Sequence, residues 1–224
     1  MDFGVIVRNF EFLFVQGFLG FGGFAGGTLR LAIPAIVVGF LLGIVIGLGR
    51  LAKTRAIRLV ATMYVEFFRG VPLVMVIFWF WFIIPNLMRI SLPEYGIALT
   101  AFVVFEAAYL AEIVRAGIQS VAGGQVEAAN ATGLSDRQTM RYIVLPQALR
   151  NMIPALVTQF IVLLKDTSLA SIIGYIDLTK AAQIVNNREI RPFELYLFIA
   201  IVYWCFSYGM SRYAGRLEQR LSLA

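Results

Sequence analysis

The chain has 224 residues, of which 60% are hydrophobic and only 14% charged, with a formal net charge of +6. Soluble domains carry about 25% charged and 45–50% apolar residues, so this composition excludes an ordinary water-soluble globule. The sequence has no histidine, which excludes histidine-based zinc sites, proton relays and Ser-His-Asp triads. The single cysteine, Cys205, excludes an internal disulfide and is interpreted as a small core residue. The basic residues are scattered between apolar segments, which indicates membrane orientation rather than nucleic-acid binding.

The first 26 residues are distinguished by a Phe- and Gly-rich stretch at 10–24 that contains Glu11 and Gln16. A secretory signal would need a compact apolar core and a small-residue cleavage site, and neither is visible here. We expect residues 1–26 to form an N-terminal extracytoplasmic segment that lies along the membrane surface. A sixth span within this segment is the alternative.

A membrane-spanning helix needs about 20 mostly apolar residues, and the remainder of the chain offers about five such segments. They lie at residues 31–48, 59–87, 95–114, 152–164 and 193–210, with a short apolar piece at 169–176. The second segment is long enough to tilt or break, and Pro72 and Pro85 are its expected kink points. Gly39, Gly43 and Gly47 form a small-residue ridge that favours close helix packing, in the bundle or at a dimer contact. The predicted fold is an all-α polytopic membrane protein.

The cations divide unevenly between the two sides of these segments. Eleven of the 19 Lys and Arg residues follow the first, third and fifth segments: Arg50, Lys53, Arg55, Arg58, Arg115, Arg137, Arg141, Arg150, Arg212, Arg216 and Arg220. Six lie on the other side: Arg8, Arg30, Arg89, Lys180, Arg188 and Arg191. Because cytoplasmic loops carry an excess of cations, we expect the N-terminus outside, and the 115–150 loop and the 216–224 tail in the cytoplasm.

The 115–150 loop contains signals for two short helices. Residues 125–132 favour a helix, and Gly133 suits a left-handed helix end. Ser135, followed three residues later by Gln138, is a capping-box pattern that starts a second helix. The sequence therefore predicts two helices that meet at a glycine bend.

The second of these helices has one apolar face. Met140, Ile143 and Val144 share it at helical spacing, and Pro146 is expected to limit how far the helix continues. A hairpin that merely joins two spans is the alternative to a functional role for this loop.

One pattern in the loop is specific. Seven positions fit the spacing E-A-A-x3-G-x9-I-x-L-P over 20 residues: Glu127, Ala128, Ala129, Gly133, Ile143, Leu145 and Pro146. The pattern resembles the EAA loop of ABC importer permeases. The resemblance implies that the loop carries a coupling helix that docks into a cleft on a separate ATPase subunit. Glu127 would then make polar docking contacts, while the small residues keep the packing close.

Three other stretches resemble the polar amino-acid branch of that family: residues 68–73 (F-R-G-V-P-L), residues 107–118 (A-A-Y-L-A-E-I-V-R-A-G-I) and residues 165–169 (K-D-T-S-L). The resemblance covers residues 27–215, the expected type I ABC importer permease domain, and is greatest to glutamate/aspartate permeases. The apolar run at 74–76 is a departure, because the family commonly has a glutamine shortly after P-L. It argues against a basic or amide substrate.

Charged side chains inside a span cost at least about 2.5–3.5 kcal/mol, so they should be paired or functional. Glu66 and Arg69 are three residues apart and can pair on one helical face, as can Glu112 and Arg115. Glu106 has no local partner, so we expect it to face the bundle interior and bond to another span.

Lys165 and Asp166 interrupt an apolar run and precede Thr167 and Ser168, which can cap a broken helix. Transporters commonly place substrates at such breaks. We therefore expect Asp166, Thr167 and Ser168 to line the translocation cavity, with Asp166 receiving a substrate ammonium. Arg69 or Lys165 could face a substrate carboxylate, and Glu66 is included in the same path. A structural cap at the end of the fourth span is the alternative.

The chain lacks the G-x-x-x-x-G-K-[ST] sequence of a P-loop, so we expect no enzyme activity and no cofactor on this chain, with ATP and Mg²⁺ on a partner. The resemblance implies several partners in a bacterial cytoplasmic membrane: ABC ATPase subunits, a second identical or homologous permease, an extracytoplasmic amino-acid-binding protein, and lipid.

The expected substrate is a polar amino acid, glutamate or aspartate. The alternatives are an ion-coupled secondary transporter or channel, although no inverted repeat is visible, and an intramembrane enzyme.

Overall fold

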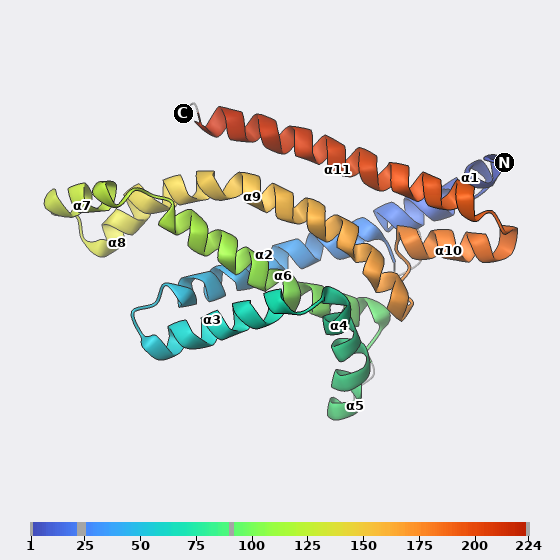
Figure 1. The fold of residues 1–224 in the computed structure, drawn as a ribbon, viewed down its shortest axis with the longest axis horizontal. Coiled ribbons are helices and arrows are strands. Elements are labelled where there is room, and N and C mark those ends of the chain that lie inside the picture. Colours follow the sequence, from blue (N-terminus) through green and yellow to red (C-terminus); the bar gives the residue numbers. More distant parts are fainter. Residues whose placement is uncertain (1, 22–25, 90–91, 223–224) are drawn as a thin grey trace.

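The computed structural model describes residues 2–21, 26–89 and 92–222. Every regular element within these ranges is helical. Four stretches are long and apolar enough to cross a membrane: α2 (Thr28–Arg50), α6 (Glu94–Gln119), residues Asp136–Ile173, which include α9 (Leu145–Asp166), and α11 (Pro192–Ser222). The bent pair Arg55–Gly70 and Leu73–Leu87 becomes a fifth if it is one span. The all-α fold with four to five spans is thereby confirmed (Figure 1).

The helices α2 and α6 cross at the centre of the molecule, and the glycine ridge makes this contact. A Cβ atom on Gly43 would lie 2.8 Å from the Leu110 Cβ, and one on Gly47 would lie 2.8 Å from the Ala111 carbonyl oxygen. The ridge therefore permits close packing within the chain, and the dimer-contact alternative for it is wrong. Core side chains such as Leu31, Phe102 and Leu163 fill the space around this crossing.

The second predicted span breaks near Pro72. The helix α3 (Arg55–Gly70) stops at Gly70, and Pro72 caps α4 (Leu73–Phe78) after a 104° bend. Proline favours extended backbone in the residue before it, and Val71 has this conformation. Beyond a π-helical turn, η2 (Trp79–Ile83), α5 (Ile84–Met88) carries Pro85 in its first turn. Pro85 is compatible with a helix start there, so its predicted kink is wrong.

The N-terminal region lies beside the N-terminal end of α11 (Figure 1). It consists of α1 (Gly4–Arg8) and the π-type helix η1 (Glu11–Leu19), which pack on α11 and on α10 (Leu178–Glu189). Arg8 makes an ion pair with Glu189 at 2.9 Å. Neither helix is long enough to cross a membrane, so the described residues contain no sixth span here. Residues 1 and 22–25 of the predicted 1–26 segment lie outside the described residues.

Between α9 and α10 the chain tightens into a 3₁₀ helix, η4 (Thr167–Ile173), and turns at Gly174, which has a φ of 91°. Asp177 then caps α10 by accepting hydrogen bonds from the backbone N–H groups of Thr179 and Lys180, at 3.0 and 2.9 Å. The chain is thus returned toward α11, the last long helix, which runs beside α9 (Figure 1).

Candidate functional site

The predicted glycine bend is present in the loop between α6 and α9. The helix α7 (Gly123–Ala131) ends at Gly133, which has a φ of 86°. The Gly133 N–H donates to the Asn130 carbonyl at 3.0 Å, and the Leu134 N–H donates to the Ala129 carbonyl at 3.2 Å. These two bonds satisfy the last carbonyls of α7 in the manner of a Schellman cap. A side chain at Gly133 would strain this left-handed backbone.

The predicted capping box is also present. The Ser135 hydroxyl accepts from the Gln138 N–H at 3.5 Å, and the Gln138 side-chain oxygen accepts from the Ser135 N–H at 2.9 Å. This box starts α8 (Asp136–Thr139). Asp136 lies 3.6 Å from the Lys53 ammonium, which places the loop on the same side of the bundle as the α2–α3 turn.

Pro146 does not end the second helix, and that prediction is wrong. The chain passes from α8 through a π-helical turn, η3 (Met140–Val144), directly into α9, where Pro146 occupies the first turn. A π-helical turn has wider hydrogen-bond spacing than an α-helix. This spacing lets the helix continue past Pro146, although proline has no backbone N–H to donate. The loop proper is consequently shorter than the predicted 115–150, because α6 extends to Gln119 and α9 begins at Leu145.

The pattern residues divide into an outward and an inward set. Five are exposed: Glu127, Ala128, Gly133, Leu145 and Pro146. Ala129 is buried and Ile143 is half-buried. The loop is held to the spans by Asn151, whose side-chain amide donates to the Ser120 hydroxyl at 2.8 Å. The arrangement is a small projecting surface on a fixed base, which suits contact with another protein.

A charged cluster lies where α2 and α6 approach the loop. Glu112 pairs with Arg115, as predicted, and its carboxylate also pairs with Arg50 of α2. The Arg115 Nε donates to Glu112 at 3.1 Å. One carboxylate thus joins two helices, and the sequence had not pointed to Arg50 as its partner.

Glu106 lies in the bundle interior and is fully buried. Gln159 of α9 donates a hydrogen bond to its carboxylate at 2.8 Å, which confirms the predicted bond to another span. The other carboxylate oxygen has no partner among the described residues. The sequence signal for Gln159, a lone amide within the apolar run of the fourth span, was available but not used.

The end of α9 differs from the predicted broken helix. The helix continues without a gap from Asp166 into η4, and Thr167 is fully buried with its hydroxyl donating to the Leu164 carbonyl at 2.8 Å. Thr167 therefore stabilises the transition between helix types rather than lining an open cavity. Lys165 is exposed, while Asp166 and Ser168 are half-buried.

The predicted Glu66–Arg69 pair is absent from the described part of the chain, and both residues are exposed. The Arg69 guanidinium instead lies over the ring of Tyr109, 5.5 Å from its centroid. This cation–π contact fixes Arg69 at the α3–α4 break. Arg69 and Glu66 are thus presented on the surface of the chain rather than neutralised within it.

A sequence model described as "Binding-protein-dependent transport system inner membrane component" matches residues 35–223. The chain belongs to this family. The permease is 41% identical over 196 residues to the probable glutamine ABC transporter permease protein GlnP of Bacillus subtilis, covering 86% of this chain and 89% of that protein. It is 40% identical over 200 residues to the glutamate/aspartate import permease protein GltK of Escherichia coli O6:H1, with the same coverage.

The fold of the permease matches that of a crystal structure of an amino acid ABC transporter with histidines, with a TM-score of 0.90, 34% identity and coverage of 98% and 99% of the two chains. The MetNI methionine transporter, in inward-facing conformations, gives a TM-score of 0.76 at 18% identity, covering 96% and 98%, which supports the fold alone. The chain is thus a multi-pass inner-membrane permease subunit of an ABC amino-acid importer. The ATPase of such a system is a separate subunit, and a binding protein is a further partner.

Proposed function

We propose that this permease pairs with a second identical or homologous permease to enclose a path for an acidic amino acid, glutamate or aspartate. The proposal rests on the observation that Lys165 and Arg69 are exposed side chains on helices that enter the membrane, and that Asp166, next to Lys165 in the chain, is half-buried. Charge at that depth requires water or a partner. The identity of about 40% to glutamine and glutamate/aspartate permeases supports a substrate with an amino-acid head group.

The roles of these residues follow from their charge. Asp166 receives the substrate ammonium, and Arg69 or Lys165 receives a carboxylate. Ser168, half-buried one turn from Lys165, adds a hydroxyl to the path, and Glu66 lies beside Arg69 on α3. Thr167 is left out of this set because its hydroxyl is engaged inside η4.

The ATPase docks on the exposed set of the loop residues: Glu127, Ala128, Gly133, Leu145 and Pro146. Ala129 and Ile143 support that surface from within. ATP and Mg²⁺ bind the ATPase, which places the loop in the cytoplasm. The C-terminal end of α11 lies toward the same end of the molecule as α7, and the N-terminus lies at the other (Figure 1). We therefore assign the N-terminus and residues 1–26 to the outside, and residues 216–224, of which 216–222 belong to α11, to the cytoplasm.

Asp166 provides the test. The permease is reconstituted with its ATPase and binding protein, and ATP-dependent uptake of glutamate, aspartate and glutamine is measured for the wild type, Asp166→Asn and Asp166→Ala. We expect uptake to fall at least about 10-fold in both variants, equivalent to about 1.4 kcal/mol of lost binding. Normal uptake by both variants at normal membrane abundance would remove Asp166 from the path. Preference for glutamine over both acids would overturn the substrate assignment.

A further inference from the structure

The helix α3 has three faces that differ in polarity and burial: a polar face, a packed face and an exposed apolar face. Its polar face carries side chains in steps of three, four, four and three residues: Arg55, Arg58, Thr62, Glu66 and Arg69. Residues at this spacing lie on one side of a helix. Apart from half-buried Thr62, all of them are exposed in the single chain. A continuous polar face on a helix that enters the membrane requires an explanation.

Packing within the bundle does not explain the polar face, because a different face of α3 packs on α2 and α6. Ala61 and Val65 are buried there. Tyr64 closes the contact by donating its hydroxyl to the Val104 carbonyl of α6 at 2.6 Å. Apart from Arg69, which lies over Tyr109 of α6, the polar face therefore points away from the neighbouring helices of its own chain.

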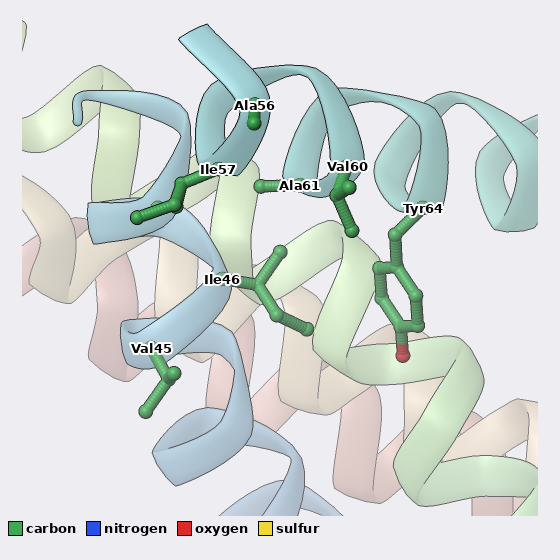
Figure 2. A pocket seen from close by; sticks show the side chains of 8 residues that line it. Val45, Ile46, Ala56, Ile57, Val60, Ala61 and Tyr64 are labelled. Atoms are coloured by element: carbon green, nitrogen blue, oxygen red, sulfur yellow. The ribbon is translucent and has the colours of Figure 1, made fainter. Parts of the chain in front are cut away.

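Lipid is not its environment either, because a third face of α3 is apolar. Val60, Met63 and Phe67 are 68%, 61% and 52% exposed at steps of three and four residues. A groove of about 470 Å³ runs along this side between α2 and α3, and Figure 2 shows Val45 and Ile46 opposite Val60 across it. This apolar flank is suited to acyl chains, so the polar face is directed elsewhere.

The polar side chains are also not neutralised within the chain. Arg69 lies over Tyr109, and Arg58 donates to the Ala52 carbonyl at 3.2 Å. Within residues 2–21, 26–89 and 92–222, neither Arg55 nor Glu66 has a side-chain hydrogen bond or ion pair. Lipid would strongly disfavour such groups, which leaves water or a second copy.

A second copy fits this face poorly. In a two-fold contact the same patch meets itself, so the contact would gather six arginines against two glutamates. Water in a path between the copies carries no such repulsion. Moreover, the face begins at the α2–α3 turn, on the side of the coupling loop, and reaches the break after Gly70, over a rise of about 21 Å.

We infer that the polar face of α3 forms the wall of the cytoplasmic part of the translocation path, along which the carboxylate of the transported amino acid passes after leaving the Arg69 region. This inference rests on the proposed function and extends it. The excess of arginine on the wall favours acidic over basic amino acids, because a carboxylate meets opposite charge along the whole route.

The test uses thiol accessibility in the reconstituted complex. Cys205 is replaced by serine, and single cysteines are introduced by Thr62→Cys and Glu66→Cys on the polar face. Val60→Cys and Met63→Cys on the apolar face are matched controls from the same turns. A charged, membrane-impermeant methanethiosulfonate is added from the cytoplasmic side. We expect both polar-face cysteines to react at least about 10-fold faster than the controls, because a thiol ionises less readily in apolar surroundings.

Modification of Thr62→Cys is further expected to block uptake, and glutamate is expected to slow that modification. Equal reaction rates on the two faces would overturn the inference. Efficient Thr62→Cys cross-linking between permease copies without labelling would overturn it as well, in favour of a copy contact. Uptake by the Cys205→Ser parent distinguishes failure of the proposed function from failure of the lining role. Loss of ATP-dependent uptake by this parent contradicts the proposed function. Normal uptake together with equal labelling of the two faces contradicts only the lining role.

Discussion

Glu106 is the most deeply placed acidic side chain of the central helix crossing, and it is held by a single amide. Gln159 donates to one carboxylate oxygen at 2.8 Å, and the other oxygen has no partner in the described residues. A buried polar group with half of its bonding capacity filled depends strongly on the remaining bond.

Removal of that bond should destabilise the permease. We expect Gln159→Leu to lower the free energy of unfolding by about 1.5–3 kcal/mol, because the carboxylate is then buried without a donor. Thermal unfolding of the purified protein in detergent measures the effect. The double variant Glu106→Gln with Gln159→Leu serves as the control and should recover part of the loss. An unchanged melting temperature for Gln159→Leu would show that Glu106 has another partner.

At the scale of elements, the contact between α2 and α6 depends on missing side chains. Gly43→Val should destabilise the protein by about 1–3 kcal/mol, since the new side chain overlaps Leu110 and forces the helices apart. Gly209→Ala in α11 is the matched control, because no atom lies within 4 Å of the added Cβ, and it should have little effect. Unfolding of both variants in the same detergent makes the comparison, and equal stabilities would refute the packing role.

The cap of α10 predicts a pH dependence. Burial raises the pKa of Asp177 from its usual value to about 6. The folded state therefore holds this proton more tightly than the unfolded state, so the stability that protonation contributes is present below about pH 4 and is lost by about pH 6. Asp177→Asn cannot titrate. We expect the melting temperature of the wild type, relative to this variant, to fall across that window and to level off above it.

Two controls accompany the Asp177 measurement. Asp177→Ala removes the side-chain acceptor for the α10 N–H groups. Compared with Asp177→Asn, which also cannot titrate, it should cost about 1 kcal/mol at every pH, as is usual for a lost N-cap. If the difference between the wild type and Asp177→Asn is the same at pH 4 and pH 7, the buried aspartate does not titrate in this range.

The sequence was informative where local chemistry decides structure. The left-handed Gly133 and the Ser135–Gln138 box were predictable because their bonds lie within a few residues. Pro146 was misread, since a π-helical turn allows α8 to continue into α9. Arg69 was paired with Glu66 from spacing alone, whereas the ring of Tyr109, 40 residues away, holds it instead. Long-range partners of this kind depend on tertiary packing, which helical spacing does not specify.

At the scale of the whole molecule, one chain leaves charged groups exposed that a membrane would not accept. The polar face of α3 and the exposed Lys165 are examples. In the assembly we propose, a second permease around a shared aqueous path satisfies them. The projecting loop at one end then connects the ATPase to α6 and α9, the two spans that flank it. Movement of the loop can then shift the populations of outward- and inward-open states.

The central claim is that this loop transmits the work of a separate ATPase. The most direct measurement is ATP-dependent amino-acid uptake and ATPase retention in the reconstituted complex carrying Gly133→Val or Glu127→Ala, with Gly215→Ala in α11 as the control. A valine at a φ of 86° strains the bend. We expect Gly133→Val to lose ATPase binding or to reduce uptake at least about 10-fold, a change worth about 1.4 kcal/mol, and the control to retain both. Undiminished uptake by both loop variants at normal membrane abundance would contradict the account.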